Sequence, residues 1–266
     1  MEKELSKDLK LAIKACLEAS KEIMSIYKGD ILKYEDKDDG SPVTLADKRG
    51  NEIIQEVLKE SSYPYMSEEG KTIPYQTRNS WDKYWLVDPI DGTKEFISRN
   101  GEFTINIALI DKHTPTLGIV YVPVSKELFF AQKGFGSFKI ENFNQVDDLY
   151  QYEFIDLQNR TYPSDYTIVV SRSHMNSETL EFVDQRKQQY GKIKTKSFGS
   201  SLKICKVAEG IAHCYPRLGP TMEWDTAAAH AVAIYSGVKI INSKNGNPIR
   251  YNKQNLLNPY FIVSNE

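Results

Sequence analysis

Residues 85–96 of this chain read WLVDPIDGTKEF. The apolar residues at the start predict the end of a buried strand, and the polar residues after them predict a tight turn. Pro89 fixes its own φ, whereas Gly92 permits a backbone angle or a close approach that other residues resist. The turn can therefore bring Asp88 and Asp91 to one point, where two carboxylates repel unless one is protonated or a cation lies between them. Oxygen ligands of this kind suit Mg²⁺, so we predict a magnesium site.

An alternative is a surface turn in which both aspartates bond only their own backbone. Two further motifs favour the metal site: SEEG at residues 67–70, upstream, and WDTAA at residues 224–228, far downstream. Taken together in this order, the three motifs resemble the magnesium-dependent, lithium-sensitive phosphomonoesterases of the inositol monophosphatase superfamily. The resemblance implies an α/β fold, the five-layer αβαβα sandwich of the inositol monophosphatase and fructose-1,6-bisphosphatase type.

The resemblance also implies a set of site residues. Two or three Mg²⁺ ions would be bound per site, with Li⁺ inhibitory, and an aspartate–threonine pair, Asp47 and Thr93, would activate the attacking water. The metal ligands would be Glu68, Asp88, the carbonyl of Ile90, Asp91 and Asp225, with Glu69 behind them. Residues alone offer simpler alternatives: Asp47 as a first-turn residue of a helix capped by Thr44, Asp225 as the N-cap of a helix over 226–236, and Glu68 with Glu69 as a solvated pair.

Several stretches narrow the substrate. TKEFI at 93–97, RNGEFT at 99–104, GSSLK at 199–203 and YPRLGPT at 215–221 are similar to the CysQ-type 3′(2′),5′-bisphosphate nucleotidases, and the similarity runs from about Gly40 to Pro259. It implies hydrolysis of 3′-phosphoadenosine 5′-phosphate to AMP and phosphate, as in sulfate assimilation. The residues expected to touch this nucleotide are Gly92, Thr93, His174, Ser200, Lys203, Arg217 and Asp225.

Other functions remain open at this level. An inositol monophosphatase or a broader sugar phosphatase would share every metal ligand. A non-catalytic phosphate sensor would lack part of the metal and water-activating set, and the sequence keeps all of it. Arg172 and Arg217 could instead be surface ion-pair partners, and Lys192, Lys194 and Lys196 are expected to be a solvated strand edge.

Composition bounds the function. A length of 266 residues with 40% hydrophobic content is enough for a substantial core, and a net charge of −2 gives no general attraction to nucleic acid, so we expect a small-molecule partner. Three unpaired cysteines fit reduced thiols, and we see neither a signal peptide nor a membrane span. The expected location is the cytoplasm, with peripheral membrane association and a homodimer left open.

Patterning predicts the elements. An N-terminal half over 1–145 should hold most metal ligands, and a C-terminal α/β half over 146–266 should hold the substrate residues and Asp225. Residues 71–82 are expected to be a weakly ordered loop. The expected helices lie at 5–27, from 44 through 58, and at 177–190, 200–210 and 226–236; the expected strands lie at 103–110, 116–124, 127–132, 167–171, 192–198, 212–215, 238–242 and 260–264, with a hairpin or exposed loop at 31–43.

Overall fold

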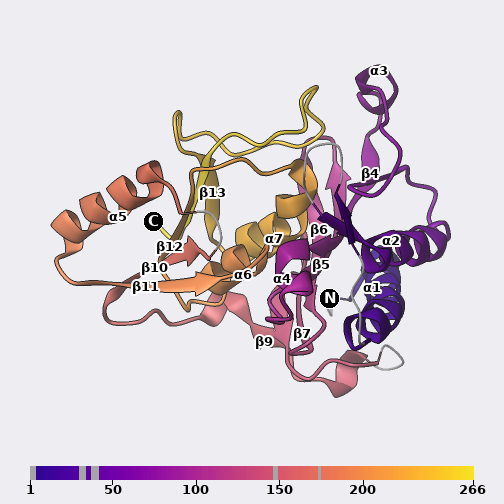
Figure 1. Cartoon of the computed structure of the whole chain (residues 1–266), viewed down its shortest axis with the longest axis horizontal. Coiled ribbons are helices and arrows are strands. Elements are labelled where there is room, and N and C mark those ends of the chain that lie inside the picture. Colours follow the sequence, from indigo (N-terminus) through magenta and orange to yellow (C-terminus); the bar gives the residue numbers. More distant parts are fainter. Residues whose placement is uncertain (1–3, 30–33, 37–41, 146–148, 173–174) are drawn as a thin grey trace.

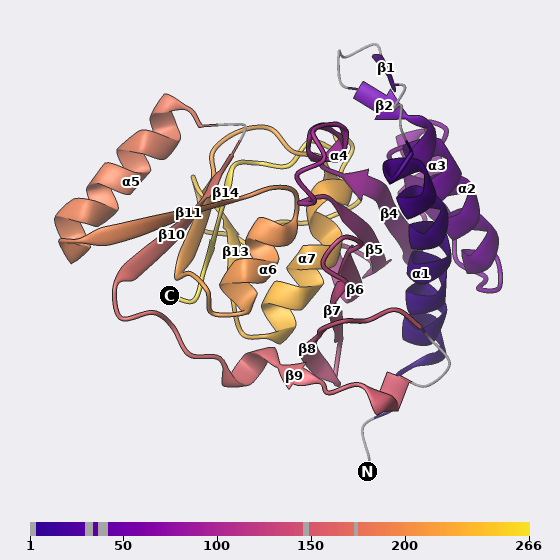
Figure 2. The same ribbon diagram turned by 60° about the horizontal axis from the view of Figure 1, so that its bottom comes forward.

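The computed structural model describes residues 4–29, 34–36, 42–145, 149–172 and 175–266. These residues form five layers: two helices, a seven-stranded sheet, two helices, a five-stranded sheet and one helix (Figure 1). The view in Figure 2 runs through the layers from α1 on the right to α5 on the left. The predicted αβαβα arrangement is confirmed.

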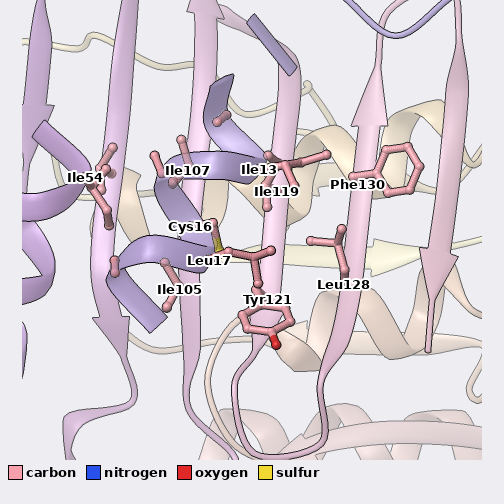
Figure 3. Close-up of a cluster of buried hydrophobic side chains, with 14 of the residues drawn as sticks. Ile13, Cys16, Leu17, Ile54, Ile105, Ile107, Ile119, Tyr121, Leu128 and Phe130 are labelled. Carbon is pink, nitrogen blue, oxygen red and sulfur yellow. The ribbon is translucent and has the colours of Figure 1, made fainter. Parts of the chain in front are cut away.

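The seven-stranded sheet has the order β3-β4-β5-β6-β7-β8-β9, parallel between the first pair and antiparallel elsewhere. Alternate residues of its strands face opposite sides, so one strand serves two cores. On β5, Ile105 and Ile107 face the first helical layer, while Ala108 and Ile110 face the second. Figure 3 shows the first of these cores, where side chains of α1 interleave with the sheet. The strands are β3 (Tyr65–Ser67), β4 (Lys83–Asp91), β5 (Thr104–Asp111), β6 (Thr114–Val122), β7 (Glu127–Gln132), β8 (Gly136–Ile140) and β9 (Ile155–Asp156).

The outer helices α1 (Lys7–Tyr27) and α2 (Leu45–Leu58) begin at side-chain caps. The Ser6 hydroxyl accepts the N–H of Leu9 at 3.1 Å, and Thr44 caps α2 as predicted. Before α2, β1 (Tyr34–Asp36) pairs antiparallel with β2 (Pro42–Thr44), so the predicted hairpin exists on its described residues.

The inner helix α7 (Glu223–Tyr235) lies unusually close to the sheet. A Cβ at Gly118 of β6 would lie 2.2 Å from the carbonyl oxygen of Ala228, so only glycine fits beneath the helix there. The alanine-rich sequence of α7 permits the same close approach from its side, because alanine adds little bulk between helix and strands. This contact fixes the height of α7 above the sheet, and with it the position of its first turn.

The five-stranded sheet has the order β11-β10-β12-β14-β13, and β10 runs parallel to both β11 and β12. The inner helix α6 (Leu202–Ala208) and α7 pack on one face, and α5 (Ser177–Tyr190) packs on the other. Strand β11 is an edge strand, and its two lysines, Lys194 and Lys196, are exposed, as is Lys192 directly before it, as predicted. The strands are β10 (Tyr166–Ser171), β11 (Ile193–Phe198), β12 (Cys214–Arg217), β13 (Lys239–Asn242) and β14 (Phe261–Ser264). Short 3₁₀ turns at Leu149–Gln151 and Leu157–Asn159 flank β9, and the second lies in the connection from β9 to the five-stranded sheet.

One prediction about order is wrong. The segment 71–82 contains the short helix α3 (Tyr75–Arg78), and its last residue, Arg78, is buried. The Arg78 guanidinium donates to Asn252 Oδ1 at 2.8 Å and to the carbonyl of Gln254 at 2.9 Å. The sequence pattern showed a polar loop, but it could not show a contact between residues 174 positions apart.

Candidate active site

Three carboxylates from separate elements converge beside the inner helical layer. Glu68 follows β3, Asp88 lies within β4, and Asp225 lies on the first turn of α7. One oxygen from each lies within 4.8 Å of the others. The backbone N–H of Glu68 donates to the carbonyl of Val87 at 3.1 Å, which anchors that residue to the neighbouring strand. The structure therefore brings together ligand candidates that are far apart in the sequence.

Asp88 is the most deeply buried of the three, with 1% of its surface exposed. Its Oδ1 accepts the N–H of Ile90 at 3.0 Å, whereas Oδ2 has no hydrogen-bond partner among the described residues. Burial raises the pKa of Asp88 well above its ordinary value, and the negative charges of Glu68, Asp91 and Asp225 raise it further. A buried carboxylate oxygen without a partner is costly, so this geometry calls for a positive group.

Asp91 reaches the same site because β4 is irregular. The pairing of β4 with β5 shifts register between Asp88 and Asp91. In a regular strand, residues three positions apart point to opposite faces, and a bulge re-aims one of them. The backbone N–H of Ser201 donates to Asp91 Oδ2. Burial raises the pKa of Asp91 to about 6, although nearby Lys203 acts in the opposite direction.

Asp225 corrects one prediction. The N-cap of α7 is Met222, and Asp225 is the third helical residue, so the helix begins three residues earlier than expected. The Oδ2 atom of Asp225 accepts the N–H of Met222 at 2.9 Å, which still satisfies a free amide of the helix start. Burial and the charges of Asp91 and Glu68 raise the pKa of Asp225.

The donor set fits Mg²⁺. It consists only of oxygen atoms, and it includes a buried carboxylate oxygen that has no partner among the residues the structure describes. Burial and mutual repulsion raise the pKa values of its carboxylates. A hard divalent cation binds such oxygens and cancels their repulsion. Residues Glu68, Asp88, Asp91 and Asp225 could hold it.

The predicted pair of Asp47 and Thr93 is also present. Asp47 Oδ2 accepts the backbone N–H of Thr44 at 2.7 Å and its hydroxyl at 2.5 Å, while Oδ1 accepts the Thr93 hydroxyl at 3.3 Å. The aspartate therefore completes the cap of α2 and contacts Thr93 as well. The Thr93 hydroxyl also lies 3.4 Å from the carbonyl oxygen of Ile90. Burial raises the pKa of Asp47 to about 6.

A pocket opens beside the carboxylates, at the carboxyl ends of the parallel strands β10 and β12, where α/β sheets commonly bind ligands. Its lining combines the acidic residues Glu68, Asp91 and Asp225 with the cations Lys203 and Arg217. Burial lowers the pKa of Lys203 to about 8, and Lys203 forms no salt bridge with any residue that the structure describes. Of the residues predicted to touch substrate, the pocket is lined by Gly92, Thr93, Ser200, Lys203, Arg217 and Asp225.

Two predicted arginines have partners within the chain. Arg172 pairs with Glu102 at 2.8 Å, the alternative that the sequence left open, while Arg217, which lines the pocket, also donates to the carbonyl of Pro220 at 2.7 Å. Glu69 is only half-buried, and its N–H lies 3.4 Å from the Ser67 hydroxyl. His174 lies outside the described residues.

Sequence reasoning missed the polar side chains of β5. Thr104 and Asn106 are fully buried within an otherwise apolar strand, and the Thr104 hydroxyl lies 3.1 Å from that of Ser200. The signal was present in FTINIALI, residues 103–110, because a threonine and an asparagine interrupt an apolar run that should not tolerate them without partners.

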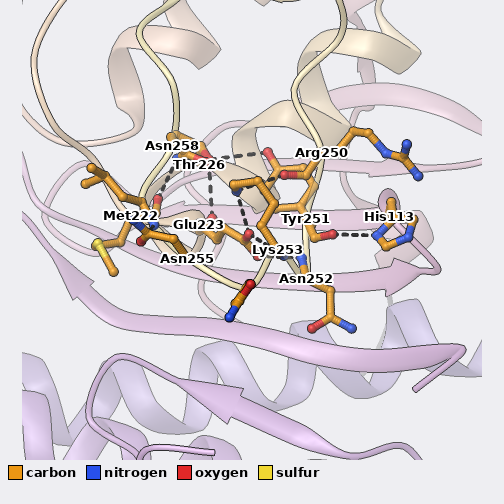
Figure 4. A network of polar contacts seen from close by, with 12 residues as sticks. His113, Met222, Glu223, Thr226, Arg250, Tyr251, Asn252, Lys253, Asn255 and Asn258 are labelled. Carbon is orange, nitrogen blue, oxygen red and sulfur yellow. Dashed lines mark hydrogen bonds and ion pairs between the residues drawn. The ribbon is translucent and has the colours of Figure 1, made fainter. Parts of the chain in front are cut away.

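A polar network braces the first turn of α7 from behind (Figure 4). Glu223 is fully buried and accepts the N–H groups of Asn252 at 2.7 Å and Lys253 at 3.0 Å, together with the Lys253 ammonium at 2.5 Å. Asn258 Nδ2 donates to the carbonyl of Met222 at 2.7 Å. The loop after β13 thus holds the turn that carries Asp225.

Comparison with known proteins gives a consistent result. The family model described as the inositol monophosphatase family matches residues 4–265. The chain is 43% identical over 246 residues to the 3′(2′),5′-bisphosphate nucleotidase CysQ of Salmonella typhimurium, covering 91% of this chain and 93% of the relative.

Solved structures agree with this match. The crystal structure of CysQ from Bacteroides thetaiotaomicron superposes with a TM-score of 0.89 and 44% identity, covering 96% of each chain. The fold also matches an IMPase/NADP phosphatase complexed with Mg²⁺ and phosphate, with a TM-score of 0.72 and 22% identity, over 94% of this chain and 87% of that one. Among the described residues, no helix is long and apolar enough to cross a membrane.

Proposed function

The chain belongs to the inositol monophosphatase family, and we propose that it is a magnesium-dependent phosphomonoesterase that hydrolyses the 3′-phosphate of 3′-phosphoadenosine 5′-phosphate to AMP and phosphate. The observation that carries the proposal is one pocket whose lining holds both an acidic cluster and the two cations Lys203 and Arg217. An acidic cluster suited to a cation can receive one phosphate through that cation. The cations of the same pocket, Lys203 and Arg217, can receive a second acidic group of the same substrate.

The acidic residues of the pocket would hold the reacting phosphate through bound metal ions. Bound Mg²⁺ would polarise a phosphate oxygen, lower the pKa of a bound water and stabilise the leaving alkoxide. Two or three Mg²⁺ ions would be held by Glu68, Asp88, Asp91, Asp225 and the carbonyl of Ile90. Li⁺ that replaces one of these ions should inhibit the enzyme.

Thr93 and Asp47 would orient the nucleophile. The Thr93 hydroxyl donates a hydrogen bond to Asp47 Oδ1, so the hydroxyl oxygen can accept a hydrogen bond from an attacking water. Asp47 is ionised above its pKa of about 6, which keeps the acceptor role at neutral pH. The pair would therefore orient an attacking water toward the phosphorus atom of the bound substrate.

The two cations of the pocket would select the substrate. Lys203 and Arg217 would bind the 5′-phosphate, and the Ser200 hydroxyl, which lines the same pocket, would add a neutral donor. An inositol monophosphate carries a single phosphate and leaves these cations without an anionic partner. We therefore expect a higher kcat/KM for the bisphosphate than for an inositol monophosphate.

A side-by-side assay of phosphate release tests this proposal. The substrates are 3′-phosphoadenosine 5′-phosphate, adenosine 3′-phosphate and inositol 1-phosphate, each with Mg²⁺ and with or without Li⁺. We expect the highest kcat/KM for the bisphosphate, a lower value for the nucleotide that lacks the 5′-phosphate, and inhibition by Li⁺. A higher kcat/KM for inositol 1-phosphate would overturn the substrate assignment, and absence of cleavage of all three would favour a phosphate sensor.

A further inference from the structure

Asn106 of β5 is paired directly with Asp88 of β4 across the seven-stranded sheet. Directly opposed residues of antiparallel strands point their side chains to the same face, about 5 Å apart at Cβ. Both side chains are 1% exposed. Asn106 therefore shares the buried face of the sheet that holds the acidic cluster.

Each of these two side chains has one polar atom without a hydrogen-bond partner among the residues that the structure describes. The atoms are Asp88 Oδ2, an acceptor, and Asn106 Nδ2, a donor. A buried polar atom without a partner destabilises the protein, and such atoms are few in native proteins. Two of complementary type on one cross-strand pair indicate a shared partner. A single water between them would accept from Asn106 Nδ2 and donate to one lone pair of Asp88 Oδ2, which leaves the other lone pair of that oxygen for the cation.

The other end of the Asn106 amide leads to a second acidic residue. Asn106 Oδ1 accepts the Ser201 hydroxyl at 2.8 Å, and the backbone N–H of Ser201 donates to Asp91 Oδ2. The Thr104 hydroxyl lies 2.9 Å from the Ser201 hydroxyl and holds it from the other side. The orientation of Ser201, and therefore of Asp91, depends on these two residues of β5.

We propose that Asn106 is a positioning residue of the metal centre, which holds Asp88 through one bridging water and Asp91 through Ser201. Asp88 and Asp91 flank the register shift of β4, and Asn106 would hold both carboxylates in place against their mutual repulsion. The inference rests on the metal centre of the proposed function but not on the substrate. Groups that orient metal ligands in this way typically contribute 10- to 100-fold to metal affinity.

Mg²⁺ binding measured by calorimetry on the full chain, without substrate, tests the inference. We expect Asn106→Ala to raise the dissociation constant for Mg²⁺ about 10- to 100-fold, and Ser201→Ala to raise it about tenfold. Ser201→Thr keeps the hydroxyl and should restore most of the affinity. Because only Mg²⁺ affinity should fall, excess Mg²⁺ should recover most of kcat.

Ser137→Ala is the matched control, since Ser137 is a fully buried serine whose hydroxyl donates to the carbonyl of Val232 at 2.8 Å. It should lose stability without a change in Mg²⁺ affinity. Dissociation constants within twofold of wild type in both Asn106→Ala and Ser201→Ala would overturn the inference, and if Asn106→Ala does not fold, Ser201→Ala with its threonine rescue decides alone. A chain that binds Mg²⁺ as described but does not cleave the bisphosphate would refute the proposed function and leave this inference intact.

Discussion

Glu223 and Asp88 are both carboxylates withdrawn from water, and their surroundings differ. Glu223 accepts three hydrogen bonds, one of them from the ammonium of Lys253 (Figure 4). Asp88 accepts one from a backbone N–H and keeps Oδ2 without a partner among the described residues. Burial raises the pKa of both, but at Glu223 the lysine acts against the rise, whereas at Asp88 four more carboxylates add to it.

The difference separates structural from functional charge. Burying a carboxylate costs several kcal/mol unless it is paired and hydrogen-bonded. At Glu223 the chain supplies the pairing itself, so the charge fixes the loop behind α7. At Asp88 the chain supplies more negative charge instead, and we propose that an external cation provides the compensation.

Asp88→Asn should have the largest effect on activity of the substitutions considered. The amide keeps the size of the side chain but removes a ligand charge, and the contribution of bound metal ions to the transition state is several kcal/mol, equivalent to about a thousandfold in rate. We expect kcat/KM for the bisphosphate to fall by about that factor in a phosphate-release assay. A variant that retains a tenth of wild-type activity would refute the assigned role.

Glu223→Gln should have the opposite profile. It leaves the Lys253 ammonium without its counter-charge, and breaking a buried pair costs about 3 kcal/mol. Denaturant unfolding should show that loss, while Mg²⁺ still raises the midpoint, because the acidic cluster is unchanged. If the variant is as stable as wild type, Glu223 is not the compensated structural charge described above.

The pH dependence of stability should sharpen the contrast. The folded-state pKa values of Asp88, Asp91 and Asp225 lie above their unfolded values of about 3.9. A raised pKa means that the folded chain binds protons more tightly, so this stabilisation is present below a pH of about 4 and is lost as the pH rises through the folded-state pKa values, which is about 6 for Asp91.

We therefore expect the metal-free protein to lose about 1–3 kcal/mol of unfolding free energy between pH 4 and 7, relative to the Mg²⁺-loaded protein. Urea unfolding at several pH values measures this difference. Parallel pH profiles with and without Mg²⁺ would show that the cluster is not the group being titrated.

Lys203 is the complementary case, a buried cation without a salt bridge to any described residue. Lys203→Met should raise KM for the bisphosphate about tenfold, because a charge-assisted contact contributes about 1.5 kcal/mol or more, and should leave KM for adenosine 3′-phosphate nearly unchanged. In the wild type, KM for the bisphosphate should also rise above pH of about 8, where this lysine loses its proton. An equal effect on both substrates would place Lys203 away from the 5′-phosphate.

Local chemistry explains which features the sequence could predict. The cap at Thr44 and the α/β alternation depend on neighbouring residues, and both are confirmed. The prediction of a turn that begins at Asp88 is wrong, because β4 continues through Asp91 and the chain leaves the strand only at Gly92. The family resemblance supplied the link between Asp88 and Asp225. The start of α7 was missed because Met222, which has no capping side chain, ends the extended segment, and its N–H is satisfied by Asp225 from within the helix.

Contacts between distant segments could not be predicted. The hydrogen bonds of Arg78 with Asn252 and of Asn106 with Ser201 join residues 174 and 95 positions apart. Nothing in either local pattern identifies the other residue. These contacts need the packed layers before they can be seen.

The central claim is that an uncompensated cluster of carboxylates is completed by Mg²⁺. The most direct test is thermal unfolding of wild type and Asp88→Asn at pH 7 across a series of Mg²⁺ concentrations. We expect the metal-free variant to unfold at a higher temperature than metal-free wild type, because one repelling charge is gone, and we expect Mg²⁺ to raise the midpoint of wild type much more than that of the variant. A metal-free variant that is less stable than wild type, with equal shifts by Mg²⁺ in both proteins, would contradict the claim.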